Sequence, residues 1–123
     1  MRAYFLFNSF TATADAGAQV QIVKNGRIRQ VQWNCAADLD TDGELYVVEL
    51  SLAPIFQGET NDAQGIVSII RARYHLLTSG ASDNGVNASF PVDVPVQAGQ
   101  LLYLNAWMEN GNVVEAGCLV WVS

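Results

Sequence analysis

Positive charge is scarce in this chain of 123 residues, and that scarcity excludes two classes of partner. Six lysines and arginines stand against twelve aspartates and glutamates, which gives a formal net charge of −6. Phosphate backbones and anionic membranes attract basic proteins, so we expect no direct binding to nucleic acid or to a membrane. No apolar run approaches the ~20 residues of a membrane-spanning helix. The short apolar start is broken by Asn8 and makes a poor signal peptide, so we expect cytoplasmic synthesis without export.

Histidine and cysteine are scarce too, which limits catalysis and metal binding. His75 is the single histidine, and no Gly-x-Ser-x-Gly nucleophile motif accompanies it. We therefore expect His75 to be an exposed strand residue and the protein not to be an enzyme. The two cysteines, Cys35 and Cys118, would form either a disulfide between sheets or two buried thiols. The missing export signal favours the buried thiols.

Alternation of apolar and polar residues is the dominant pattern in the sequence. It is clearest from Phe90 to Val96, where every second residue is apolar and the others are Pro91, Asp93 and Pro95. This period of two predicts a half-buried strand. Because proline cannot donate a ladder hydrogen bond, the two prolines place this strand at the edge of a sheet. A turn over residues 97–100 follows, in which glycine can adopt a positive φ.

The same pattern predicts eight strands along the chain. They cover residues 3–10, 19–24, 27–37, 44–53, 66–77, 89–96, 100–108 and 112–122. Eight antiparallel strands joined by tight turns and long loops predict an all-β fold, a jelly-roll-like β-sandwich of two sheets. An immunoglobulin-like sandwich is the alternative, but its Cys-Trp-Cys order is absent. We divide the chain into an N-terminal strand or arm with a linker, residues 1–18, and a β-sandwich domain, residues 19–123.

Local signals refine the course of individual strands. The alternation slips in the third strand, which predicts a β-bulge near Arg29 or Gln30. Asn25-Gly26 follows Lys24 between two apolar runs and predicts a hairpin, because both residues tolerate the positive φ of a type I′ turn. Asn110-Gly111 predicts a second turn of this kind.

Two sets of residues are candidates for binding a protein partner. Tyr4, Phe5, Leu6 and Phe7 make the start of the chain so apolar that either the domain or a neighbouring chain must cover it. Four arginines, which alternate on two strands, form the other set: Arg27, Arg29, Arg71 and Arg73. If those strands are neighbours, they form a basic stripe suited to the carboxylates of a partner. Otherwise they are separate surface residues that face strand acids such as Glu49.

An acidic turn matches the spacing of a calcium-binding loop. Asp38, Asp40 and Asp42 are followed by Gly43 and then by Glu49, as in D-x-D-x-D-G-x5-E. Calcium would bind to the three aspartates, together with the carbonyl of Glu44. The residues after the turn are strongly β-forming, however, and a strand would carry Glu49 away from the loop. A solvated acidic turn without metal is therefore the favoured interpretation.

The three tryptophans are candidates for the core or for a sugar-stacking surface. Trp33 and Trp121 have apolar neighbours of the same parity, Val31 and Leu119, so we expect both in the core. Trp107 shares its parity with Tyr103 and Asn105 and is the best candidate for an exposed ring. Together with Tyr103 it would bind carbohydrate if the protein is a binding module.

Three segments resemble small structural proteins of tailed bacteriophages. They are residues 26–33, 77–80 and 90–104, within a resemblance that extends from Val20 to Trp121. The resemblance implies a jelly roll that decorates or cements a capsid, commonly as a trimer, while some members form fibre or spike heads. It says nothing for or against calcium at the acidic turn.

We therefore expect a virion structural protein on the capsid surface, made in the host cytoplasm. It would be a decoration or cement protein that binds the major capsid protein as a homo-oligomer, most simply a homotrimer, without a cofactor. The alternative is a carbohydrate- or receptor-binding module of a fibre or spike, which could depend on calcium.

Overall fold

The computed structural model describes residues 1–10, 18–37, 45–52, 68–75, 85–108 and 114–123. It confirms the eight predicted strands, with boundaries that differ by a few residues at most. The strands are β1 (Arg2–Phe10), β2 (Ala18–Gln21), β3 (Gly26–Ala37), β4 (Leu45–Ser51), β5 (Ser68–His75), β6 (Val86–Val96), β7 (Leu101–Met108) and β8 (Val114–Val122).

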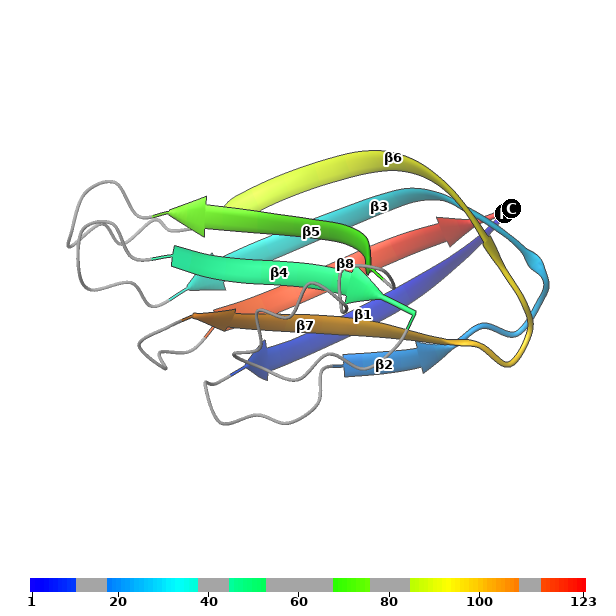
Figure 1. The fold of residues 1–123 in the computed structure, drawn as a ribbon, viewed down its shortest axis with the longest axis horizontal. Coiled ribbons are helices and arrows are strands. Elements are labelled where there is room, and N and C mark those ends of the chain that lie inside the picture. The colour runs from blue at the N-terminus through cyan, green and yellow to red at the C-terminus, as the bar shows by residue number, and fades with distance from the viewer. Residues whose placement is uncertain (11–17, 38–44, 53–67, 76–84, 109–113) are drawn as a thin grey trace.

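The strands form two four-stranded antiparallel sheets that pack face to face (Figure 1). The order in the first sheet is β1-β8-β3-β6 and the order in the second is β2-β7-β4-β5. Every connection except that from β4 to β5 therefore passes from one sheet to the other. This topology is a jelly-roll-like sandwich, as the sequence predicts. The two ends of the chain lie together, because Arg2 pairs with Val122 (Figure 1).

The predictions for β6 and for the bulge in β3 are confirmed. β6 is an edge strand of the first sheet, where the missing amide hydrogens of Pro91 and Pro95 are tolerated. The register of β3 shifts between Ile28 and Gln30 against both of its neighbours, β6 and β8. The shift lets Ile28 and Val31 both face the core although they are three residues apart.

The hairpin predicted at Asn25-Gly26 is wrong. β2 and β3 belong to different sheets, so this segment crosses between the layers. Gly26 does not have a positive φ; in the described residues only Gly99 does, with φ of 94°. Gly26 is needed for another reason, because a Cβ there would lie 2.7 Å from the carbonyl oxygen of Ser123. The turn at Asn110-Gly111 lies outside the described residues, and its flanking strands, β7 and β8, belong to different sheets.

The turn between β6 and β7 is fastened to the crossing between β2 and β3. The amide of Gly99 donates to the carbonyl oxygen of Ile22, and the amide of Ile22 donates to that of Gln100, both at 2.8 Å. The side-chain oxygen of Asn25 accepts a hydrogen bond from the amide of Ala98 at 2.8 Å. These bonds join the two sheets at the end where the chain termini lie.

The core consists of the inward-facing side chains of both sheets. Trp33 is buried in it as predicted, with its Nε1 donating to the hydroxyl of Tyr74 on the opposite sheet at 2.9 Å. Cys35 and Cys118 are free and buried, which agrees with the favoured prediction of two thiols. Burial raises the pKa of each thiol to about 12.

Candidate functional site

The outer face of the β1-β8-β3-β6 sheet carries the most distinctive surface of the described chain. Strand register places side chains from all four strands in rows across this face. One row contains Phe7, Gly117, Asn34 and Asn87, and the next contains Phe5, Leu119, Gln32 and Ser89. Aromatic side chains from β1 thus lie at one side, amides and a hydroxyl at the other, and a glycine between them.

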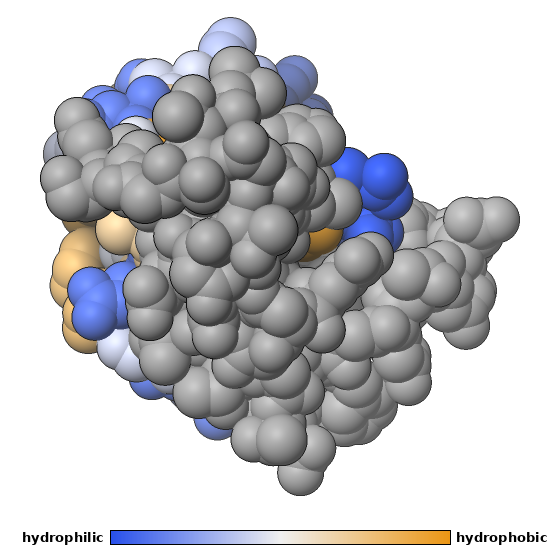
Figure 2. Space-filling view, turned by 90° about the vertical axis from the view of Figure 1, so that its left-hand side faces the viewer, coloured by the Kyte–Doolittle hydropathy of each residue, from blue (hydrophilic) through white to orange (hydrophobic). Residues whose placement is uncertain are grey.

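A groove of about 880 Å³ runs over these rows. Besides the residues of the two rows, the groove is lined by residues 33, 35, 36, 85, 86, 88, 115 and 118. We call this feature the outer groove. Gly117 contributes to the hollow because it has no side chain to fill the space between β1 and β3. Figure 2 shows hydrophobic residues (orange) directly beside hydrophilic ones (blue) at its left margin.

The aromatic side of the outer groove comes from the apolar start of the chain. β1 pairs with β8 in the sheet, so its side chains alternate between core and solvent. Tyr4 and Leu6 are buried in the core and are not available to a partner. Phe5 and Phe7 face outward, with 63% and 58% of their surface exposed.

Trp121 is not in the core, contrary to the prediction. On β8 the inward positions are taken by Val120 and Val122, so Trp121 lies half-buried on the outer face. Its Nε1 donates to the side-chain oxygen of Gln32 at 3.2 Å. That hydrogen bond orients the Gln32 amide at the edge of the outer groove.

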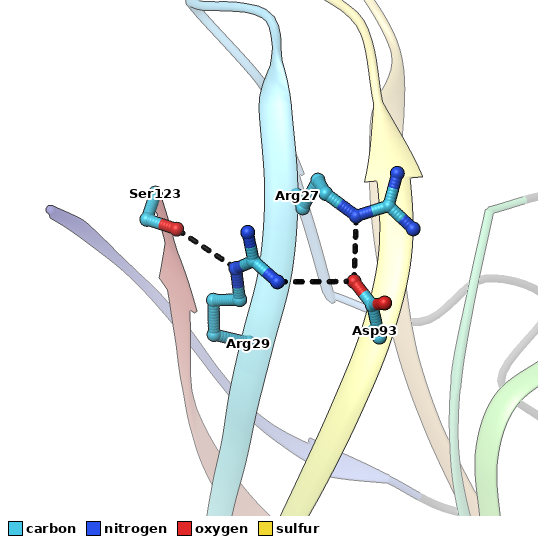
Figure 3. Close-up of polar contacts among 4 residues, drawn as sticks. All are labelled: Arg27, Arg29, Asp93 and Ser123. Atoms are coloured by element: carbon cyan, nitrogen blue, oxygen red, sulfur yellow. Dashed lines mark hydrogen bonds and ion pairs between the residues drawn. The ribbon is translucent and has the colours of Figure 1, made fainter.

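A charged cluster lies at the other end of the same face (Figure 3). Arg27 Nε donates to Asp93 Oδ1 at 2.6 Å, and Arg29 Nη1 donates to the same oxygen at 3.2 Å. Arg29 Nε also donates to the hydroxyl of Ser123 at 2.9 Å. The hydrogen bond from Arg27 and the two positive charges lower the pKa of Asp93. Two guanidinium groups share one carboxylate, so this cluster keeps a net positive charge on an acidic protein.

The predicted stripe of four arginines does not form. Arg27 and Arg29 lie on β3 in the first sheet, whereas Arg71 and Arg73 lie on β5 in the second. Arg71 instead faces Glu49 on the neighbouring strand β4, with Nε 3.3 Å from Oε2. Arg71 therefore follows the alternative prediction, in which the arginines are separate residues that face strand acids such as Glu49.

Glu49 itself is more buried than its sequence position suggests, with none of its surface exposed. It lies on the outward parity of β4 with Ser51, and Asn105 lies opposite it on β7. All three are buried, so the outer face of the second sheet is covered at this point. Burial raises the pKa of Glu49, and the nearby charge of Arg71 partly offsets that rise.

Several predicted site residues lie outside the described residues. The acidic turn with Asp38, Asp40 and Asp42 is one of them, so calcium binding there stays a prediction. Glu49 lies in a strand, as the β-forming sequence before it indicates. The side chains of His75 and Trp107 are not described either, although both residues belong to strands. Within the described part, no group of three or more His, Cys, Asp or Glu side chains could hold a metal ion.

A second apolar surface lies at the margin of the sandwich where β5 and β6 are the edge strands of the two sheets (Figure 1). The inward side chains there are only half-buried, although they pack against the core. We call this surface the β5–β6 margin; it consists of Ile70, Ala72, Tyr74, Val86, Ala88, Phe90, Val92 and Val94. On the central strands the corresponding residues, such as Val48 and Leu104, are fully buried. Tyr103, predicted to bind carbohydrate, is half-buried on the second sheet, away from the outer groove.

The outer groove and the buried Glu49 were not predicted from the sequence. Four strands that are far apart in the chain form the groove, so no local pattern reveals it. The one local signal is Gly117, since glycine inside a strand often marks a place of close approach or an unfilled surface.

No protein-family model matches the chain, and no curated protein matches it. Solved structures match its fold. The K3 adhesin domain of Lys-gingipain from Porphyromonas gingivalis has 13% identity and a TM-score of 0.55, over 94% of this chain and 73% of that domain. Eiger TNF from S. frugiperda has 11% identity and a TM-score of 0.55, over 98% and 92% of the two chains.

The globular domain of zebrafish complement 1qA protein gives a further match, with 8% identity and a TM-score of 0.51. It covers 97% of this chain and 94% of that domain. At such low identity these likenesses show the jelly-roll-like β-sandwich and nothing about function, because this fold carries many unrelated functions. In the described residues, no helix has the length and apolar character needed to cross a bilayer.

Proposed function

We propose that this chain is a virion structural protein, a capsid decoration or cement protein that assembles with copies of itself. The observation that supports this function best is the β5–β6 margin. Apolar side chains that belong to the core by their parity are only partly buried there. Removing the rest of that surface from water would favour association by about 25 cal/mol for each Å².

The edge strands also indicate how the copies would pack. An exposed edge strand can pair with another chain through its backbone. Pro91 and Pro95 remove two amide donors from β6, so extension of the sheet across this edge is disfavoured. Association through the β5–β6 margin would therefore depend on side-chain packing, and we propose a homotrimer in keeping with the phage proteins that the sequence resembles.

The charged cluster supplies a surface for the major capsid protein. Arg27 and Arg29 have side chains that are 42% and 47% exposed while they share Asp93. Their remaining guanidinium hydrogens can donate charge-assisted hydrogen bonds to carboxylates of the capsid protein. The role is one of binding and not of catalysis, with synthesis in the host cytoplasm and a final place on the capsid surface.

Sedimentation velocity tests the assembly. Three copies of the 13.3 kDa chain give a particle of about 40 kDa. Val92→Arg places a charge in the β5–β6 margin and should give a monomer, because the charge would be desolvated in the contact. Val23→Arg, at an exposed position outside the margin, should leave the trimer intact. A wild-type protein that stays monomeric at high concentration would contradict the proposed assembly.

Co-sedimentation with shells of the phage that encodes the chain tests the capsid contact. Arg27→Gln with Arg29→Gln should weaken binding and reduce its dependence on salt, since the charged contacts would be lost. Lys24→Gln removes an exposed cation outside the cluster and serves as the matched control. Equal binding by all three proteins would exclude the cluster as the capsid contact.

A further inference from the structure

The outer groove has a feature that assembly through the β5–β6 margin does not use, which is a pair of exposed aromatic rings beside free amides. Phe5 and Phe7 are two residues apart on one face of β1, so they lie about 7 Å from each other along the strand. A Cβ at Gly117 would lie 3.5 Å from a ring atom of Phe7 and 3.8 Å from ring atoms of Phe5. Both rings therefore lean over the glycine and border the hollow that it leaves.

The opposite side of the outer groove offers hydrogen-bonding groups. Asn34 and Asn87 are adjacent across β3 and β6, and both are exposed. Among the residues that the structure describes, neither amide has a side-chain hydrogen bond. Each can donate twice and accept through its oxygen. Gln32 has its oxygen occupied by Trp121, which leaves its two amide hydrogens for a ligand.

Charge is nearly absent from this surface. Glu115 is the one ionisable acid or base that lines the outer groove in the described part of the chain, apart from the buried thiols. It lies in the row beyond Phe7 and Gly117, at the end of the groove. An anionic ligand would be repelled by Glu115 and by the net charge of the chain. Between the rings and the amides the described lining has no charged group to pair with a cation, so the groove suits an uncharged molecule.

We propose that the outer groove binds a neutral oligosaccharide. A sugar ring has an apolar face, which can stack on Phe5 or Phe7, and a rim of hydroxyl groups, which can pair with Asn34, Asn87 and Gln32. Concave sites of this mixed character, with apolar walls and a few polar groups, are typical of small-ligand binding. A protein surface packed here would have to pair every one of these amides or leave them desolvated at a cost.

Sugar binding would occur on a single copy of the chain, so it does not depend on assembly. A glycan array tests it, carrying neutral oligosaccharides of hexoses and N-acetylhexosamines together with uronic-acid and sialylated ones. We expect binding to a subset of the neutral oligosaccharides and none to the acidic ones. The Val92→Arg protein should bind the same subset, which separates this inference from the proposed assembly.

Variants of the outer groove give the decisive comparison, with affinity for the best array sugar measured by calorimetry. Phe7→Ala should weaken binding roughly tenfold through loss of the ring contact. Asn34→Ala with Asn87→Ala should weaken it at least as much. Val23→Ala and Gln19→Ala, which change an exposed apolar residue and an exposed amide elsewhere, should bind as the wild type does.

Folding of each variant is checked by its thermal midpoint, which should change little for side chains this exposed. The inference is overturned if no neutral oligosaccharide binds at millimolar concentration. It is equally overturned if acidic sugars bind better than neutral ones, or if Phe7→Ala binds like the wild type while remaining folded.

Discussion

Replacing Gly26 by alanine should destabilise the protein although its backbone conformation suits any residue. Gly26 has no positive φ, so strain in the backbone is not the cause. The added Cβ would lie 2.7 Å from the carbonyl oxygen of Ser123 and 2.9 Å from Cγ1 of Val122. Carbon atoms in contact prefer about 3.5–4.0 Å, so the end of β8 must move.

That movement would disturb the pairing between β3 and the end of the chain. The carbonyl oxygen of Ser123 accepts a hydrogen bond from the amide of Arg27 at 2.9 Å, and the amide of Ser123 donates back at 3.0 Å. Overpacking of this kind costs about 2 kcal/mol. For a chain of this length such a loss lowers the thermal midpoint by about 8 °C.

Gly117→Ala is the matched control, since it makes the same chemical change in a neighbouring strand. Its Cβ would lie 3.5 Å from the nearest atom, which is an ordinary contact. Alanine there should stabilise the protein by about 0.5 kcal/mol, because it reduces the freedom of the unfolded chain. Urea denaturation followed by tryptophan fluorescence measures both variants. A Gly26→Ala protein as stable as Gly117→Ala would refute the reasoning from close approach.

Three further predictions concern ionisable groups. The pKa of Asp93 is lowered in the folded protein. The ionised carboxylate therefore stabilises the fold above the ordinary pKa of 3.8, and this stabilisation is lost as the pH falls through the folded pKa. Asp93→Asn should make the urea midpoint depend less on pH in the acid range. The pKa of Glu49 is raised, so the contribution of this group to folding stability is fully present below the ordinary pKa of 4.5 and is lost as the pH rises through the folded pKa. Glu49→Gln should remove that decline, and parallel profiles for variant and wild type would show that burial does not govern this carboxyl. Cys35 and Cys118, each with a pKa of about 12, should resist iodoacetamide at pH 8 when folded and react fully in urea, as mass spectrometry would show.

The strands could be predicted because burial on one face imposes a local period on the sequence. β6 is the clearest case, since its alternation and its two prolines indicate both the strand and its place at an edge. The bulge in β3 could be predicted for the same reason, because a slip in the period must be absorbed somewhere. These features depend on residues that are close together in the chain.

Features that depend on distant strands could not be predicted. Asn25-Gly26 is a strong hairpin signal, but whether two consecutive strands pair is decided by the sheet that each one joins. An apolar neighbour of the same parity, Leu119, predicts a core position for Trp121, but both parities of β8 contain apolar residues, so composition does not identify the inner face. The partner of Arg71 likewise depends on the pairing of β4 with β5.

The candidate site was predictable only in part. The sequence indicated the apolar start of the chain, and β-pairing then showed that Phe5 and Phe7, but not Tyr4 and Leu6, stay outside. The outer groove arises from register across four strands, which no single stretch of sequence contains.

Cryo-electron microscopy of phage shells mixed with the protein tests the proposed function most directly. Additional density should appear on the outer surface of the shell as symmetric clusters of β-sandwiches. In each cluster Ile70, Val92 and the rest of the β5–β6 margin should be buried between copies, with Arg27 and Arg29 toward the shell. Bare shells, or single sandwiches bound with that margin open to solvent, would contradict the account.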